Sequence, residues 1–373
     1  MLISTKEFKE VASAILLAVD ENAANLELVT KNDNLRLSVT NREYYVSKIF
    51  HLDTPTDFHA VVDARVFLGL IAGITTDTFD LSIKDNTVVI KAGKSKYKTP
   101  MIYENDALAV LTPITIKNVT VSMNISKDIL QSILNVNSKE LLKVKNLDVN
   151  PLQKLYYIDE TGCFTFTTGA TLNRFTLEKP IKLLLTDKVV KLFKLFNTDA
   201  TLSYGVDALT DGSAQTKIVF STTDTYVSAI INYDDVLLND IQRPCAATKS
   251  YIDEKYSNHL VLSSAELSAA IGRLMLFAKN TVTNQNMRNI PAKVTFTDSE
   301  LTLTDALENA EVVTVESGSY GDTAYSMIIN LADLKLVLDS CKNEHITFNF
   351  GNHRSIIINR GSIINLLPES RSI

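Results

Sequence analysis

The residues best placed to do chemistry in this chain begin with a glycine–lysine–serine run. Gly93-Lys94-Ser95 looks like the end of a phosphate-binding loop, in which a lysine and a hydroxyl hold nucleotide phosphates and magnesium. That loop requires a glycine where the chain has Val88, and a helix where it has the strand-like Tyr97-Lys-Thr. The run is therefore interpreted as a hairpin turn, and nucleotide hydrolysis is not expected.

The titratable side chains give no acid–base or metal-binding pattern. Asp20-Glu21 and Asp234-Asp235 are adjacent pairs, whose side chains point in different directions on a helix or strand. The histidines have no carboxylate or cysteine at ligand spacing, and are interpreted as surface or packing residues: His51, His59, His259, His345 and His353. We expect no enzyme, cofactor or metal, and an enzyme with an unrecognised site is the weakest alternative.

Basic residues recur on the outward faces of the expected helices, although the chain has a net charge of −6. They are Lys6, Lys9 and Arg65 in the first third, Lys127, Lys139, Lys143, Lys145, Lys188, Lys191 and Lys194 in the middle, and Arg273, Lys279, Lys335 and Lys342 in the last. Taken helix by helix, lysine that merely solvates an exposed face is the simpler interpretation. The same arrangement on six helices favours a shared surface for a polyanion.

The helices that carry these residues follow a pattern that appears once in each third of the chain. A short strand-like run ends at Ser4, Ser126 or Ser263, and apolar residues at helical spacing follow each serine. A second run ends at Asp63, Thr186 or Asn330 and is followed by another amphipathic helix. Equivalent caps lie about 120 to 145 residues apart, so the repeated unit has the size of a domain.

Alternating segments follow each second helix. Residues 78–83, 88–90 and 95–98 alternate apolar and polar side chains, with Asp85-Asn86 between the first two. The last third repeats this over 346–350, 355–358 and 362–364. Such runs predict antiparallel hairpins, so each third is expected to be an α+β layer of two helices on an antiparallel sheet.

Composition and cysteine usage fit a folded intracellular protein. Hydrophobic residues make up 45% of the chain, which suffices for ordinary cores. Cys163, Cys245 and Cys341 are scattered and odd in number, so we expect no structural disulfide and a reducing cytoplasm. The apolar stretch 11–19 follows two glutamates and obeys helical spacing, which argues against a secretory signal, and no run is long enough to cross a membrane.

The order and spacing of these elements resemble the DNA sliding clamp, the β subunit family of bacterial DNA polymerase III, over the whole chain. The stretch from Phe58 to Tyr97 is similar to the family's second helix and closing hairpin in domain one. Thr167-Thr-Gly-Ala-Thr-Leu172 is similar to its Thr-Asp-Gly-His-Arg-Leu turn, and Ile363-Ile-Asn-Leu-Leu-Pro368 to its apolar ending. The resemblance implies clamp domains at 1–118, 119–250 and 251–373.

The resemblance also implies a crescent that pairs head to tail into a homodimeric ring around double-stranded DNA. Such a ring binds without sequence specificity and gives DNA polymerase its processivity in replication, with no chemistry of its own. The residues implied to face DNA are Lys6, Lys9, Arg65, Lys127, Lys139, Lys143, Lys188, Lys191, Lys194, Arg273, Lys279, Lys335 and Lys342. Weak phosphate contacts suit sliding, because many strong ones would hold the protein in place.

A partner pocket between domains two and three is implied as well, where DNA polymerase and the clamp loader bind through short linear peptides. Its wall would be Leu152, Thr167, Gly169, Thr171, Leu172, Leu366, Leu367 and Pro368. Ala170 and Thr171 replace the family's His-Arg, and residues 233–244 replace its Phe-Pro-x-Tyr segment. A last core strand is the alternative for Leu366 and Leu367. The departures favour a divergent partner peptide, as in a phage-encoded replisome.

For the subunit interface, the resemblance points to the first helix of domain three and the end of domain one. The residues are Leu274, Met275 and Leu276 on one side and Ile102 and Leu108 on the other, and core packing is the alternative for each. The second functional hypothesis is a monomeric clamp-fold adaptor that binds replication partners without encircling DNA. In either case we expect a cytoplasmic protein, in the host cytoplasm if it is phage-encoded, without membrane contact.

Overall fold

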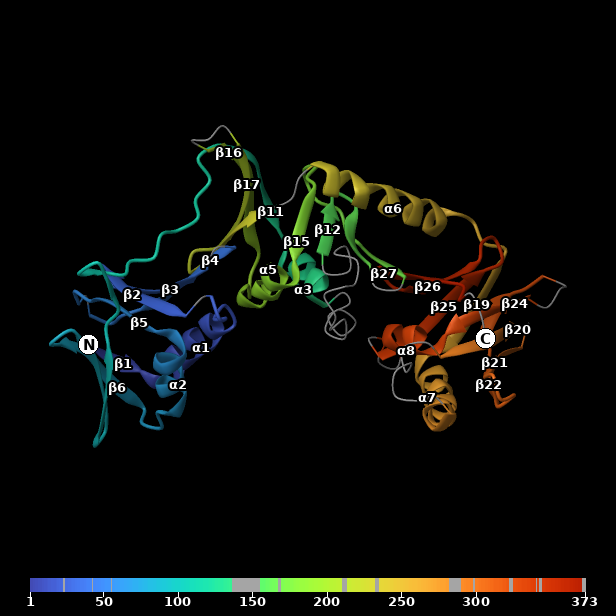
Figure 1. Ribbon diagram of the computed structural model, residues 1–373, viewed down its shortest axis with the longest axis horizontal. Helices are drawn as coiled ribbons and strands as arrows, with labels where there is room; N and C mark the ends of the chain where they lie inside the picture. Colours follow the sequence, from blue (N-terminus) through green and yellow to red (C-terminus); the bar gives the residue numbers. More distant parts are fainter. Residues whose placement is uncertain are drawn as a thin grey trace. The chain divides into compact units, whose positions relative to one another are not determined.

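The computed structural model describes residues 1–373 except 23, 42, 55, 136–154, 167–168, 210–212, 232–234, 282–289, 298, 322–324, 340, 342–343 and 371–373. The described residues form antiparallel sheets with helices packed on them, which confirms the α+β prediction (Figure 1). The chain divides into two compact units, unit 1 with Met1–Leu134 and Lys188–Asn232, and unit 2 with Asn135–Asp187 and Tyr233–Ile373. Each unit takes part of the middle third, and the two predicted domain boundaries stay a prediction.

Unit 1 contains a four-stranded sheet at the N-terminal end of the chain. Its strand order is β1-β6-β7-β8, with bounds Leu2–Ser4, Thr78–Lys84, Thr87–Ala92 and Ser95–Pro100. Asp85 and Asn86, with φ of 50° and 56°, make the predicted turn between β6 and β7, and Gly93, with φ of 57°, makes the turn between β7 and β8. Gly93-Lys94-Ser95 is thus part of a hairpin, as predicted. The short pair β9 (Tyr103–Glu104) and β10 (Ala107–Leu108) follows.

The second sheet of unit 1 has eight strands in the order β11-β16-β17-β18-β4-β3-β2-β5. Their bounds are Val119–Ile125, Ala200–Ala208, Ala214–Ser221, Thr225–Ile231, Tyr44–His51, Asn34–Thr40, Asn25–Lys31 and His59–Asp63. The pairing of β18 with β4 joins the middle third of the chain to the first. Lys48 reinforces this junction, because its ammonium lies 3.0 Å from a carboxylate oxygen of Asp224.

The helices of unit 1 begin at or near the predicted caps. They are α1 (Thr5–Leu16), α2 (Ala64–Gly73), α3 (Lys127–Asn135), α5 (Asp187–Lys191) and the 3₁₀ turn η2 (Leu192–Leu195). Asp63 caps α2 by accepting from the Val66 amide at 2.8 Å. Ser4 precedes α1 with an extended backbone but makes no capping hydrogen bond, so that part of the prediction was wrong. Ser4 is the last residue of β1, paired there with Thr78.

Unit 2 contains a nine-stranded sheet in the order β15-β12-β13-β14-β27-β26-β25-β19-β23. The bounds are Leu183–Thr186, Leu155–Asp159, Gly162–Phe166, Ala170–Arg174, Ile363–Pro368, Ser355–Arg360, His345–Phe350, Asn258–Ser263 and Ser317–Ser319. A four-stranded sheet, β22-β21-β20-β24, comprises Ala310–Thr314, Glu300–Thr304, Pro291–Phe296 and Tyr325–Asn330. The β14–β27 pairing joins the middle third to the end of the chain.

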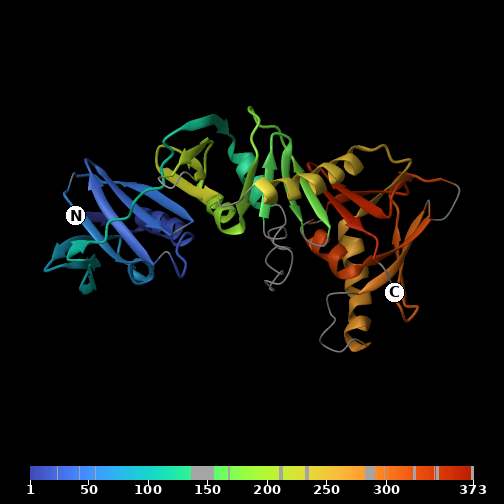
Figure 2. The ribbon, with the colours of Figure 1, turned by 45° about the horizontal axis from the view of Figure 1, so that its top comes forward.

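Two of the helices in unit 2 are the predicted ones and a third was missed. α7 (Ser264–Thr281) and α8 (Leu331–Asp339) pack on the main core of this unit, into which α8 buries Leu331, Leu334, Val337 and Leu338. The missed helix is α6 (Asp235–Asp253), which lies along the nine-stranded sheet (Figure 2). None of the described helices is long and apolar enough to span a membrane.

Candidate nucleic-acid and partner interfaces

The helices α1 and α2 lie side by side and present basic residues at their outer surface. α1 buries Phe8, Val11, Ala12 and Ile15, which leaves Lys6 exposed on the same helix. Arg65, in the first turn of α2, is exposed as well. Because α1 and α2 bury their apolar faces against one another and the sheets, the polar residues are left outward.

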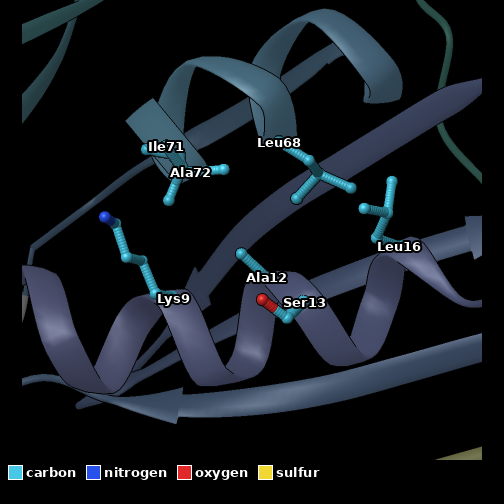
Figure 3. Close-up of a pocket in the computed structure, with 7 residues that line it drawn as sticks. All are labelled: Lys9, Ala12, Ser13, Leu16, Leu68, Ile71 and Ala72. Atoms are coloured by element: carbon cyan, nitrogen blue, oxygen red, sulfur yellow. The ribbon is translucent and has the colours of Figure 1, made fainter. Parts of the chain in front are cut away.

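A groove of about 190 Å³ runs between these two helices (Figure 3). It is lined by Lys9, Ala12, Ser13 and Leu16 of α1 and by Leu68, Ile71 and Ala72 of α2. The Lys9 ammonium donates a hydrogen bond to the carbonyl of Ile74, the residue that follows α2. Lys9 therefore has a structural role in joining the two helices, in addition to the DNA-facing role predicted for it.

The basic residues of α3, α5 and η2 form a second group in unit 1. Lys127 and Lys194 are exposed, whereas Lys188 pairs with Asp20, its ammonium 3.3 Å from the carboxylate. Lys191 is partly buried at the end of α5. Among the described residues of unit 1, the exposed predicted cations without an ion pair are Lys6, Arg65, Lys127 and Lys194.

In unit 2 the predicted cations that the structure describes are paired with carboxylates. Arg273 of α7 donates two hydrogen bonds to Glu311 of β22, at 2.8 and 2.6 Å. Hydrogen bonding from Arg273 lowers the pKa of the Glu311 carboxyl, and Glu311 in turn raises the pKa of Arg273. Lys335 lies 3.2 Å from Asp339, one turn along α8. Lys139, Lys143 and Lys342 fall outside the described residues, and the side chain of Lys279 is not described.

The predicted pocket residues are brought together by the pairing of β14 with β27. Ala170 pairs with Leu366, Thr171 with Asn365 and Leu172 with Ile364. Gly169 lies against this junction so closely that an added Cβ would come 2.1 Å from the Leu366 carbonyl oxygen. No side chain larger than hydrogen fits there without moving the backbone of β27.

The pocket residues divide between the two faces of this sheet. Leu172 is buried under α6. On the same face of the sheet, Leu366 is partly exposed and Pro368 is exposed. Thr171 is buried on the opposite face, where its hydroxyl accepts from the Asn365 amide at 2.7 Å, and Leu367 belongs to the main core. Leu152 and Thr167 lie outside the described residues. The core-strand alternative therefore applies to Leu367, whereas the side chain of Leu366 is partly exposed to solvent.

The residues predicted for a subunit contact also differ in exposure. Leu274 is buried in the core of unit 2 and Met275 packs partly against it, while Leu276 is 60% exposed and Phe277, next to it on α7, is 49% exposed. Ile102 and Leu108 in unit 1 are half-buried. Val110 near them is exposed. Among the described side chains of α7, Leu276 and Phe277 are the exposed large apolar ones.

The structure reveals histidine–carboxylate pairs that the sequence does not indicate. His59 lies 2.9 Å from Glu27, His345 lies 2.6 Å from Glu316, and His353 lies 2.5 Å from Glu254. Each pair joins residues distant in the chain. In the part of the chain that the structure describes, no three metal-ligating side chains come together.

Of three comparisons with known proteins, the one with solved structures places the fold. The sequence matches no protein-family model and no curated protein. Among solved structures, the chain is similar to the DNA polymerase III subunit beta from Pseudomonas aeruginosa, with a TM-score of 0.76 at 14% identity over 100% of both chains. It is also similar to the beta subunit from the DNA polymerase of Streptococcus pyogenes, with a TM-score of 0.77 at 14% identity over 100% of this chain and 99% of that one. The DNA polymerase III beta subunit from Thermotoga maritima gives 0.73 at 14% identity, with the same coverage. The chain has the three-domain β-clamp fold over its full length.

Proposed function

We propose that this protein is a processivity factor of DNA replication, a ring-shaped clamp that encircles duplex DNA without sequence specificity. The observation that carries the proposal is the fold, which corresponds to β clamps over 100% of the chain. A partial match could reflect a shared domain, whereas full-length correspondence keeps every repeat that a ring needs. The clamp would act without catalysis or a cofactor.

The charge distribution supports non-specific DNA contact of moderate strength. Lys6, Arg65, Lys127 and Lys194 are exposed on helices, where they can meet phosphates without reading bases. The chain as a whole has a net charge of −6, which disfavours tight binding of any polyanion. A closed ring can stay on DNA while each phosphate contact exchanges, so weak contacts suffice. Lys9 and Lys188 would contribute less, because their ammonium groups have partners within the protein.

Two sheet edges support head-to-tail assembly of two copies. β8 is an edge strand of unit 1 with exposed Lys96 and Lys98, and β22 is an edge strand of unit 2 that follows Asp305 and Glu308. Opposite charges on β8 and in the turn before β22 favour pairing of β8 in one copy with β22 in the other. Such a contact between unlike surfaces makes a ring when its rotation closes.

The apolar end of α7 would add to the same contact. Leu276 and Phe277 are exposed on α7, one turn after Arg273. Arg273 joins α7 to β22 by its hydrogen bonds to Glu311. Burying two large apolar side chains stabilises an interface by about 3 kcal/mol. We therefore expect Met275→Asp, which places a charge next to this surface, to give monomers in analytical ultracentrifugation. A dimeric variant would show that α7 does not form the interface.

The partner site proposed is the β14–β27 junction, where DNA polymerase and the clamp loader would dock short peptides. Gly169, Leu366 and Pro368 lie together there, and Leu172 lies beneath α6 on the same face. The domain boundaries 118/119 and 250/251 belong to this proposal, as does a cytoplasmic location. A phage origin stays a hypothesis.

The proposal is tested by retention on DNA circles. The protein is loaded on nicked circular DNA by its cognate loader, and half of the sample is then linearised. A sliding clamp stays with circles through gel filtration and is lost from linear DNA, because only the closed form traps it. Equal retention on both forms after successful loading would reject the ring, and a monomeric adaptor would become the better hypothesis.

A further inference from the structure

Helix α6 covers an apolar face of the nine-stranded sheet. Its inward stripe consists of Leu238, Ile241, Cys245, Thr248 and Ile252, at the spacing of one helix face. Beneath it lie Tyr157 of β12, Phe164 of β13, Leu172 of β14 and Leu184 of β15. Figure 2 shows α6, in yellow, crossing the green strands of this sheet.

The apolar contact of α6 is small for a helix of this length. Of its described side chains, only Ile241 and Cys245 are buried apolar groups, whereas the much shorter α8 buries four. Thr248 is buried in the same stripe and adds little apolar area. Pro244 lies inside the helix and has no amide hydrogen to donate to the Asp240 carbonyl, which weakens the middle of α6.

The polar contacts that hold α6 are exposed or, for the Lys249 ammonium at 3.5 Å from the Thr161 hydroxyl, part-buried. Arg174 pairs with Asp253, and both side chains are 44% exposed. The Lys182 ammonium lies 3.5 Å from the Gln242 side chain, and His353 pairs with Glu254 just after the helix. Ion pairs in contact with water contribute little to stability.

Removal of α6 would leave the backbone hydrogen bonds between the described strands of the sheet in place. A helix satisfies its own amides and carbonyls, and β14 keeps its pairing with β13 and β27. Among the described side chains, the cost is exposure of the small apolar seam and loss of the polar contacts and of the ring contact between Tyr251 and His353. Such an element opens at lower free energy than the core beneath it.

We propose that α6 is a detachable cover, which in this structure occupies the apolar sheet face where a partner peptide docks. The partner would be an amphipathic peptide with apolar residues at the spacing of Ile241, Cys245 and Ile252, so that it replaces α6 side chain for side chain. The identity of this face as the replication partner site rests on the proposed function, because Leu172 and Leu366 belong to both. The opening of α6 does not depend on that function.

Thiol modification of the intact protein tests the opening. Cys163, Cys245 and Cys341 are all buried free thiols, but only Cys245 moves with α6. We expect a maleimide, followed by mass spectrometry of the cysteine peptides, to modify Cys245 at least about tenfold faster than Cys163 or Cys341. Equal rates for the three thiols would show that α6 leaves only when unit 2 unfolds, and would overturn the proposal.

Three variants sharpen this measurement. Ile241→Ala removes the main apolar anchor of α6 and should raise the Cys245 rate by about tenfold while the other two rates stay unchanged. Asn239→Ala, on the exposed side of α6, should change none of them. Ile329→Ala is a similar truncation in the main core. It should not raise the modification rate of Cys245 relative to that of Cys341. An Ile241→Ala chain in which all three rates rise together would contradict the cover.

A peptide added in trans tests whether the uncovered face accepts a partner. The probe is a fluorescein-labelled peptide of residues 238–253 with Cys245→Ser, and the control probe also carries Ile241→Asp. The first should bind the Ile241→Ala chain about tenfold more tightly than the wild type, because its own helix competes less. Absence of binding to either chain would overturn docking at this face. Loss of DNA retention would reject the ring and leave these results intact, so the two proposals fail separately.

Discussion

The helix pair α1–α2 of unit 1 and the helix pair α7–α8 of unit 2 bury similar apolar stripes but differ in their outward charge. Lys6 and Arg65 are exposed and have no ion pair among the described residues. Arg273 and Lys335 are held by Glu311 and Asp339. The apolar spacing of a helix fixes what it buries and leaves its surface charge free to vary. Among the described side chains of these four helices, the exposed cations without an ion pair lie in unit 1, next to the exposed Glu7 and Glu10 of α1.

The free edges of the two units differ in the same sense. β8 in unit 1 carries Lys96 and Lys98, whereas the segment leading into β22 in unit 2 carries Asp305 and Glu308. A basic edge and an acidic edge discourage pairing of like with like. The comparison therefore favours contact between unlike units, which is the arrangement that a head-to-tail ring requires.

Charge reversal on β8 should have the largest effect. Lys96→Glu with Lys98→Glu would set like charges against Asp305 and Glu308, and we expect the dimer to dissociate at least about 100-fold more readily. Sedimentation velocity measures this. Asp305→Lys with Glu308→Lys in the same chain should restore the dimer. Lys31→Glu with Lys84→Glu, which lie on other strands of unit 1, is the matched control, and an equal loss there would contradict edge pairing.

Removal of the unpaired helix cations should have the next largest effect. We expect replacement of Lys6, Arg65, Lys127 and Lys194 by alanine to weaken DNA binding about tenfold or more at low salt, and to reduce the slope of log K against log salt by about 2 to 4. Fluorescence anisotropy with duplex DNA over a salt series gives both quantities. Alanine at Lys31 and Lys84 tests for a general charge effect. A similar loss in that control would remove the helices as the binding surface.

Much of the fold could be predicted because its signals are local. Asp63 and Asn330 cap helices, since a side-chain oxygen reaches an amide within three residues. Asp85 and Asn86 form the hairpin turn because these residue types tolerate positive φ. The fold class then follows from the repetition of such units.

The unpredicted features depend on distant residues or weak stripes. The sequence does not indicate that β4 pairs with β18, or that β14 pairs with β27, because alternation within a strand does not identify its neighbour. Helix α6 was missed because its stripe includes Cys245 and Thr248, and because Pro244 interrupts it. Glu311 neutralises Arg273 from another element, β22. Glu254, just after α6, pairs with His353, which is far away in the chain.

A smaller effect is expected from buried charge in unit 1. Asp207 is 2% exposed, and hydrogen bonds from Lys217 and from the amides of Asn118 and Lys117 lower the pKa of its carboxyl. Because its pKa is lowered in the folded state, the ionised Asp207 carboxylate stabilises the fold above about pH 4, the ordinary carboxyl pKa. This stabilisation is lost as the pH falls through the lowered pKa. We expect Asp207→Asn to lower the melting temperature by several degrees at pH 7 and to flatten the loss of stability in acid.

Glu311→Gln in unit 2 is the comparison for that measurement, because the pKa of Glu311 is lowered through an exposed partner. Its effect on melting between pH 3 and pH 7 should be smaller than that of Asp207→Asn, since water screens the Arg273 contact. Calorimetry over this range follows both variants. A larger shift for Glu311→Gln would show that the α7–β22 contact, and not the burial of Asp207, governs acid stability.

The smallest expected effect concerns the paired cations of unit 2. Arg273→Ala or Lys335→Ala should change DNA affinity by no more than about twofold, because each charge is already neutralised by a carboxylate. Glu311→Gln sharpens this, since it frees the Arg273 guanidinium and should increase the affinity for duplex DNA and steepen its salt dependence. If Glu311→Gln has no such effect while Arg273→Ala weakens binding as much as a unit 1 substitution, Arg273 contacts DNA despite its partner. The contrast between the two units would then lie in their sheet edges and not in their helices.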